Sequence, residues 1–258
     1  MAISKRAKVL KAISRLVPRR LMATSFSLKQ STLDIIEAVW NIAKHKKPIF
    51  RRGLTVENYK VGSVLCELLY KNPDQKKKVI FFLHAGSYLS GTVSSARNQS
   101  MRYPCNTSAA LFVVDYRTSP VAPFPAALDD AFAAYKFLQE LLPEAEIIFL
   151  GDSAGGGLAV STCLKALEEG VSPPKKVILN SPWTDLSCSS ESYFNRQKID
   201  VVLQREFLKK CVKIYAGTNV TNEFVSPVFA DLKGFPPLFI NVGTDEILLD
   251  DSVRLAEN

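Results

Sequence analysis

The chain has 258 residues, of which 47% are hydrophobic and 22% charged, with a formal net charge of +8. These proportions exclude a disordered chain and a collagen-like repeat. The length allows one large α/β domain or two small ones. The five cysteines are scattered and form no Cys-x-x-Cys pair. They argue against structural zinc and a disulfide framework, and they predict a reducing, cytoplasmic location.

The positive charge is concentrated near the start of the chain. Residues 1–60 hold 14 Lys and Arg against 3 Asp and Glu, whereas residues 61–258 hold 19 against 22. Val9, Ile13 and Leu16 fall at helical spacing among these basic residues. Such a helix can lie on an anionic membrane surface or close over an apolar pocket, but we favour a solvated helix docked by one face. Nucleic-acid binding is not expected, because no known nucleic-acid-recognition motif accompanies the basic residues. We expect neither a cleavable signal peptide nor a membrane span.

A second helix is predicted from Ser31, whose hydroxyl can cap it, with Asp34 three residues on. Residues 1–50 therefore form a predicted N-terminal helical cap without strands. From residue 55 the periodicity changes to alternation. Residues 55–61 and 64–70 predict a β-hairpin around Gly62 and Ser63.

The rest of the chain alternates short apolar runs with helical patterns. The runs cover 79–83, 111–114, 146–150, 177–179 and 238–242, and the helical patterns lie near 126–142, 155–169 and 202–216. Continuous β-branched and aromatic runs separated by helices are typical of a parallel sheet covered on both faces. We therefore predict one α/β domain over residues 51–258, with a mostly parallel sheet flanked by helices.

Gly151-Asp-Ser153-Ala-Gly155 satisfies Gly-x-Ser-x-Gly directly after a predicted strand and before a predicted helix. In a nucleophile elbow the serine occupies a sharp turn, so small residues are needed two positions before and after it. The N–H groups of the following helix face the place where negative charge develops. Ser153 is therefore the predicted nucleophile, and the alternative is a glycine-rich turn with an idle serine.

His84-Ala-Gly86-Ser87-Tyr88 follows the strand predicted at 79–83 and occupies the place of a His-Gly-Gly-Gly loop. Such a loop completes an oxyanion hole with backbone N–H groups. The expected donors are those of Gly86 and Ser87, joined by Ala154. Ala85 and Ser87 replace two glycines, and their Cβ atoms narrow the space beside the acyl group. We predict that His84 anchors the loop rather than acting as a base.

From about Tyr70 to its last residue, the chain resembles the hormone-sensitive-lipase-like esterases, a branch of the α/β-hydrolases. The resemblance rests on the serine motif together with the segments 115–117, 123–130, 181–185 and 236–238. It implies an α/β-hydrolase fold and places the acid of a Ser-Asp-His triad at Asp245. Asp250 and Asp251 are alternatives, but they lie within a helical pattern and are expected to be surface or capping groups.

The resemblance also requires a histidine after Asp245, and the remaining residues contain none. His45 precedes every other element and is not expected to replace it. Two interpretations remain. The chain is either part of a longer esterase whose final strand and helix are absent here, or a natural chain that has lost its base. We favour the first. A polypeptide of these 258 residues should then have little turnover and should expose a sheet edge and a helix-docking surface.

The predicted function is carboxylic ester hydrolysis through an acyl-enzyme on Ser153, with Asp245 orienting the absent histidine. Short- or medium-chain acyl esters are the expected small-molecule substrates, entering beneath residues 1–50. No metal or organic cofactor is expected. The alternative is a non-catalytic protein that binds a small ligand in the same pocket, which loss of the base would favour. The sequence leaves the oligomeric state open.

Overall fold

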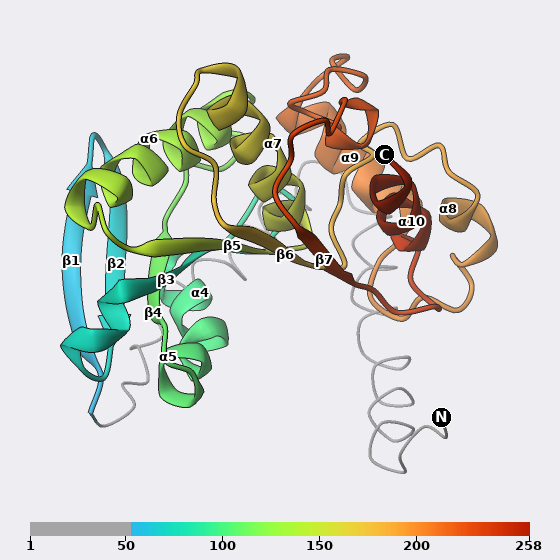
Figure 1. Cartoon of the computed structure of the whole chain (residues 1–258). Coiled ribbons are helices and arrows are strands. Elements are labelled where there is room, and N and C mark those ends of the chain that lie inside the picture. Colours follow the sequence, from blue (N-terminus) through green and yellow to red (C-terminus); the bar gives the residue numbers. More distant parts are fainter. Residues whose placement is uncertain (1–52) are drawn as a thin grey trace, which may run out of the picture.

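The computed structural model describes residues 53–258, which form a seven-stranded sheet with helices on both faces (Figure 1). The predicted cap at 1–50, including His45, lies outside the described residues. The strands are β1 (Thr55–Val61), β2 (Val64–Tyr70), β3 (Lys78–Leu83), β4 (Ala110–Val114), β5 (Glu146–Asp152), β6 (Lys176–Asn180) and β7 (Leu238–Asn241). The helices are α4 (Val93–Ser100), α5 (Arg102–Asn106), α6 (Ala126–Leu141), α7 (Ala154–Glu168), α8 (Ser192–Asn195), α9 (Arg205–Tyr215) and α10 (Leu249–Glu257), with short 3₁₀ turns η1 (Pro73–Lys77) and η2 (Pro227–Phe229).

The sheet has the strand order β1-β2-β4-β3-β5-β6-β7. β1 and β2 form the predicted hairpin, with Val61 opposite Val64, and β2 also pairs antiparallel with β4. All later pairs are parallel. The carboxyl ends of β3, β5, β6 and β7 therefore meet at one edge of the sheet, where a fold of this kind places its ligands. The predicted α/β fold with a mostly parallel sheet is confirmed.

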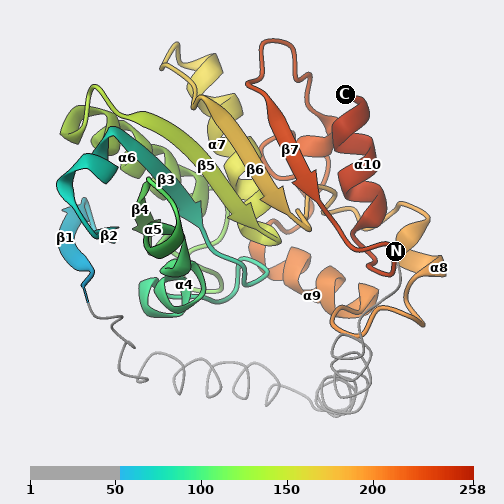
Figure 2. The ribbon, with the colours of Figure 1, turned by 60° about the horizontal axis from the view of Figure 1, so that its bottom comes forward.

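Alternation along the central strands supplies both faces of the sheet with core residues. Phe81 of β3 packs in the larger core, beneath α6 and α7, with its ring 4.9 Å from that of Phe149. Its neighbours Ile80 and Phe82 belong to the smaller core on the face covered by α4 and α5. Figures 1 and 2 show these helix pairs on opposite sides of the sheet. Each fully buried side chain of this size stabilises the fold by about 1.5–3 kcal/mol.

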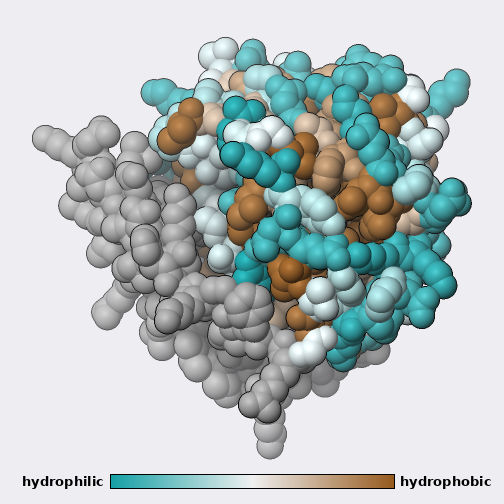
Figure 3. Space-filling view, turned by 90° about the vertical axis from the view of Figure 1, so that its left-hand side faces the viewer, coloured by the Kyte–Doolittle hydropathy of each residue, from teal (hydrophilic) through white to brown (hydrophobic). Residues whose placement is uncertain are grey.

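The two outer strands of the described sheet differ in polarity. Near β1, Glu57 forms an ion pair with Lys76 at 2.8 Å, and Lys60 is exposed. Figure 3 looks at this side of the molecule, where hydrophilic residues separate smaller hydrophobic patches. β7 at the opposite edge has the uncharged sequence Leu-Phe-Ile-Asn, and Phe239 is 64% exposed. This part of the chain therefore ends its sheet on an apolar edge strand.

Several short elements differ from the predicted ones. The helix predicted from residue 202 begins at Arg205. α4, α5 and α8 were not predicted, because they are short or lack a continuous apolar stripe. Between residues 53 and 258, no helix combines the length and the apolar character that a bilayer crossing requires.

Candidate active site

Ser153 lies in the sharp turn between β5 and α7, in the conformation expected of a nucleophile elbow. Its φ is +54°, a left-handed value that L-residues adopt rarely and at some energetic cost. The turn needs glycine on both sides, since a Cβ on Gly151 would lie 2.3 Å from the carbonyl oxygen of Gly155. The small residues recognised in the sequence are therefore required by backbone contact.

The last residue of β6 and the segment after it hold the backbone of Ser153 from both sides. The Ser153 N–H donates to the carbonyl oxygen of Asn180 at 2.9 Å, and the Trp183 N–H donates to the Ser153 carbonyl oxygen, also at 2.9 Å. Asn180 also donates from its side-chain amide to the Asp152 carboxylate at 2.7 Å. Sequence patterns did not indicate this clamp, because main-chain partners between distant segments leave no residue signature. It supports the unfavourable φ of the serine.

The first turn of α7 presents N–H groups beside Ser153. Gly156 and Gly157 donate to the Ser153 carbonyl oxygen at 2.9 and 3.2 Å. The first two N–H groups, those of Ala154 and Gly155, have no acceptor within the helix. The helix dipole adds a partial positive charge at this end. The predicted donor Ala154 therefore lies at the positive end of α7, directly after Ser153.

The predicted oxyanion loop is a tight turn from Gly86 to Leu89. The Leu89 N–H donates to the Gly86 carbonyl oxygen at 3.0 Å, and both central residues, Ser87 and Tyr88, have positive φ values of 54° and 60°. This pattern is typical of a type I′ turn. A Cβ on Gly86 would lie 1.9 Å from the carbonyl oxygen of Ser90. The glycine that remains in the motif is therefore the one that has no room for a side chain.

Tyr88 anchors this turn against α7 and α9. Its ring stacks on Tyr215 at 3.9 Å, and its carbonyl oxygen accepts a 2.9 Å hydrogen bond from the Ser119 N–H. Its hydroxyl would lie 3.0 Å from a Cβ on Gly157 in α7. The turn thus packs directly against the helix that begins after Ser153. The structure brings the predicted oxyanion residues and the predicted nucleophile into neighbouring segments.

His84 is buried beneath the same loop. Its Nδ1 donates to the carbonyl oxygen of Ala85 at 2.8 Å, and its ring stacks on Tyr116 at 4.1 Å. Burial lowers the pKa of His84 to about 4, against a smaller opposite effect of the Ala85 hydrogen bond. These contacts agree with an anchoring role and leave the imidazole a weak base.

Asp245 follows β7 and is half-buried. The segment around it is fixed by the Gly243 N–H, which donates to the Glu246 carboxylate at 2.8 Å, and by the Ile247 N–H, which donates to Asp200 at 2.9 Å. Because β5 and β7 are parallel, Ser153 and Asp245 follow strand ends at the same edge of the sheet. β6 lies between these strands.

Asp250 and Asp251, the alternatives to Asp245 as the triad acid, have different surroundings. Asp250 accepts a hydrogen bond at 2.7 Å from the N–H of Ser192, the first residue of α8, which is a capping contact as expected. Asp251 is fully buried, so the expectation of a surface or helix-capping group was wrong for it. It accepts hydrogen bonds from the N–H groups of Thr184 and Asp185, both at 2.8 Å. These donors, rather than solvent, bind the Oδ2 atom of the carboxyl group.

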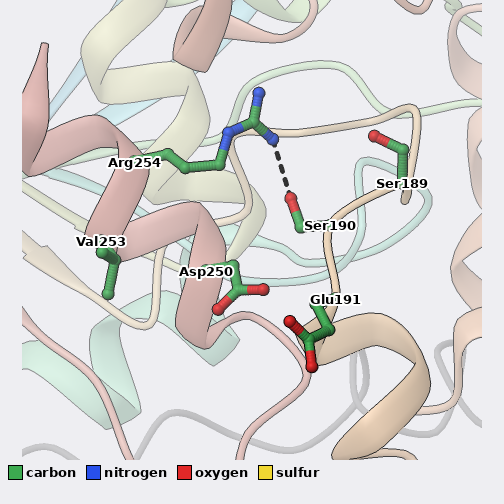
Figure 4. Close-up of a pocket in the computed structure, with 6 residues that line it drawn as sticks. All are labelled: Ser189, Ser190, Glu191, Asp250, Val253 and Arg254. Carbon is green, nitrogen blue, oxygen red and sulfur yellow. Dashed lines mark hydrogen bonds between the residues drawn. The ribbon is translucent and has the colours of Figure 1, made fainter.

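A cavity of about 370 Å³ opens between α10 and the segment before α8. Figure 4 shows its six lining residues, which are Ser189, Ser190, Glu191, Asp250, Val253 and Arg254. Of these only Asp250 was considered as a site residue, as an alternative to Asp245, and Ser153 and the predicted oxyanion donors do not line this cavity. In residues 53–258, no three His, Cys, Asp or Glu side chains are grouped as a metal site requires.

Known proteins are similar to this chain in sequence and in fold. The α/β-hydrolase fold family matches residues 80–258. The chain is 39% identical over 186 residues to an acetyl-hydrolase of Streptomyces hygroscopicus, covering 71% of this chain and 62% of that protein. It is 36% identical to an esterase of Acinetobacter venetianus, covering 70% of this chain and 60% of the relative. The chain thus spans somewhat over half the length of these two relatives.

Solved structures of esterases also resemble this chain. A crystal structure of a hormone-sensitive lipase from a metagenome library superposes with a TM-score of 0.84 at 31% identity, covering 97% of this chain and 82% of that one. An esterase/lipase from an uncultured bacterium gives 0.83 at 32% identity, covering 98% and 83%. The chain belongs to the α/β-hydrolase family, within its hormone-sensitive-lipase-like esterases.

Proposed function

We propose that the chain is a carboxylic ester hydrolase in which Ser153 is the nucleophile. The observation that carries this proposal is the left-handed φ of Ser153, at the start of a helix whose first N–H groups are free of intrahelical partners. Ser153 Oγ attacks the ester carbonyl carbon, and the alcohol leaves from the tetrahedral intermediate. Water then hydrolyses the acyl-enzyme. The N–H groups of Gly86, Ser87 and Ala154 stabilise the oxyanion in both steps.

Asp245 serves as the acid that orients a histidine base. Neighbouring strands are spaced by about 4.8 Å, so the ends of β5 and β7 are about 10 Å apart, a gap that an imidazole between two side chains can bridge. This sequence contains only His45 and His84, and the contacts of His84 argue against it as the base. The base is therefore assigned to neither of them. Small acyl esters of short or medium chain length are the proposed substrates, in keeping with the acetyl-hydrolase and esterase relatives.

A fluorophosphonate probe tests the nucleophile. In a version of the chain that supplies a histidine after Asp245, the probe should attach to Ser153, located by peptide mass spectrometry. Ser153→Ala should abolish the labelling. Ser161→Ala is the matched control, since Ser161 lies in α7 and donates to the Gly157 carbonyl oxygen at 3.1 Å. Labelling that survives Ser153→Ala would refute the assignment.

The alternative is a protein that binds a small ligand in the same place without hydrolysing it. The observation that favours it is that His84, the one histidine among residues 53–258, is buried beneath the loop and bonded to the Ala85 carbonyl oxygen rather than placed as a base. A pure binder would remain unlabelled at Ser153 even in the histidine-containing version. It would still bind a non-hydrolysable ester analogue, measured by calorimetry.

A further inference from the structure

Asp251 accepts hydrogen bonds from two consecutive main-chain N–H groups of the segment between β6 and α8. Its Oδ2 accepts from both Thr184 and Asp185 at 2.8 Å, and the Thr184 hydroxyl lies 3.3 Å from the Asp251 carbonyl oxygen. Its Oδ1 is buried without a hydrogen-bond partner among the described residues. The carboxyl group therefore fixes the position of two peptide units, at the cost of burying a polar atom.

Those two peptide units continue directly into the clamp on the nucleophile. Thr184 follows Trp183, whose N–H donates to the Ser153 carbonyl oxygen. A Cβ on Gly157 would lie 2.2 Å from the Trp183 carbonyl oxygen, so α7 and this segment are in backbone contact. A displacement at residue 184 would consequently be passed to Ser153 through one covalent neighbour.

Asp251 is also tied to the segment that carries Asp245. It lies in the first turn of α10, which begins four residues after Asp245. Ile247 and Leu248 between them are fully buried, and the Ile247 carbonyl oxygen accepts a 2.7 Å hydrogen bond from the Ser192 hydroxyl. The connection from Asp251 back to Asp245 is therefore short and packed.

We infer that Asp251 is a positioning residue that fixes the nucleophile turn and the Asp245 segment relative to each other. This inference rests on the proposed function, because it assigns a purpose to holding Ser153 and Asp245 together. One carboxyl group joins the β6–α8 segment to α10. The first is hydrogen-bonded to Ser153, and the second follows Asp245 in the chain. The side-chain hydrogen bonds of Asp251 go to Thr184 and Asp185, so it acts on the two predicted catalytic groups through these neighbours.

Several ionisable groups face Asp251. Asp185 and Tyr193 lie beside it, Cys188 is close enough to interact electrostatically, and Arg254 binds the Asp185 carboxylate at 2.8 Å. Burial is the largest effect and raises the pKa of Asp251 to about 8, whereas the two N–H donors act in the opposite direction. A protonated Asp251 accepts both N–H bonds without burying a charge.

Hydrogen exchange of backbone amides tests the inference without requiring activity. Asp251→Ala should accelerate exchange at Thr184, Asp185, Trp183 and Ser153 by at least about tenfold, as expected when a buried acceptor is lost. Asp250→Ala is the matched control, adjacent on the same helix, and its effect should stay within α8. Unchanged exchange at Ser153 in Asp251→Ala, or equal acceleration in Asp250→Ala, would overturn the inference.

Asp251→Asn supplies a second test should Asp251→Ala fail to fold. The amide oxygen can accept the same two N–H bonds, so protection at Trp183 and Ser153 should return to within about twofold of the wild type. Because burial raises the pKa of Asp251 from 3.8 to about 8, the stability contributed by its protonated form is lost as the pH rises between these values. Exchange in the wild type, corrected for its intrinsic pH dependence, should therefore rise over this range and level off above it, and in Asp251→Asn it should not. Exchange at Ser153 that is as fast in Asp251→Asn as in Asp251→Ala would refute the inference. The same pattern in a Ser153→Ala background separates this result from any failure of ester hydrolysis.

Discussion

The carbonyl oxygen of Leu83, the last residue of β3, lies 2.2 Å from the place where a Cβ on Gly155 would stand. The carbonyl oxygen of His84 lies 2.4 Å from the same place. Real Cβ atoms never come this close to oxygen, so the start of α7 and the end of β3 are in backbone contact. This contact brings the nucleophile turn and the oxyanion turn together.

Gly155→Ala should therefore lose about 3 kcal/mol or more of the free energy of unfolding, because rigid backbone on both sides must move. Gly217→Ala is the control: no atom lies within 4 Å of its Cβ, but its φ is +61°. That variant should lose only about 1 kcal/mol. Urea unfolding followed by circular dichroism measures both. Equal losses in the two variants would contradict the contact between Gly155 and Leu83.

His84 should make folding less stable in acid. Burial lowers its pKa from 6.5 to about 4, so the folded protein binds the proton less readily than the unfolded chain. The stability contributed by neutral His84 is complete above pH 6.5 and is lost as the pH falls through 4. Urea unfolding at pH 7, 5.5 and 4.5 should show a decline that is smaller in His84→Gln.

An NMR titration checks the same group directly. The His84 ring protons should shift with a midpoint near pH 4, and His45→Gln serves to assign the signal. A midpoint near 6.5 would show that burial does not lower the pKa of His84. It would also weaken the case against His84 as a base.

The buried ion pair between Glu67 of β2 and Arg97 of α4 should contribute strongly to stability when only one partner is removed. Their side chains are 3% and 7% exposed. Arg97→Leu leaves an uncompensated carboxylate and should cost about 3–5 kcal/mol. Lys77→Ala breaks a pair that is more than 80% exposed and should change stability by less than about 0.5 kcal/mol. Thermal unfolding that ranks the two variants equally would argue against a buried pair.

Prediction from the sequence was most successful where periodicity and local chemistry agreed. The hairpin around Gly62 and the apolar run of β3 combine a clear period with turn residues or β-branched and aromatic side chains. The turn at Ser153 was recognisable because its backbone demands glycine at fixed positions. α4 contains Arg97 and several polar residues, so it lacks the stripe that identifies a helix.

The environment of Asp251 was not predicted, although the spacing contains a signal. Leu248, Asp251 and Leu255 follow each other at intervals of three and four, which places all three on one helix face, and all three are buried. Aspartate side chains are usually exposed, so the residue type predicted a surface position and this spacing was not enough to predict burial. No residue pattern in the sequence indicates the backbone hydrogen bond from Trp183 to Ser153, because this bond depends on where β6 ends relative to β5.

The 258-residue polypeptide should hydrolyse p-nitrophenyl acetate only weakly. Under the proposed function, Ser153 has no base in this polypeptide because no histidine follows Asp245 in the sequence, while the oxyanion donors and substrate binding are expected to remain. In serine hydrolases these leave a residual acceleration of about 10³–10⁴ over water. The measurement is steady-state release of p-nitrophenol, with Ser153→Ala as the reference. Turnover comparable to an intact esterase, abolished by Ser153→Ala and retained in His45→Gln, would show that a base other than His45 acts in this chain.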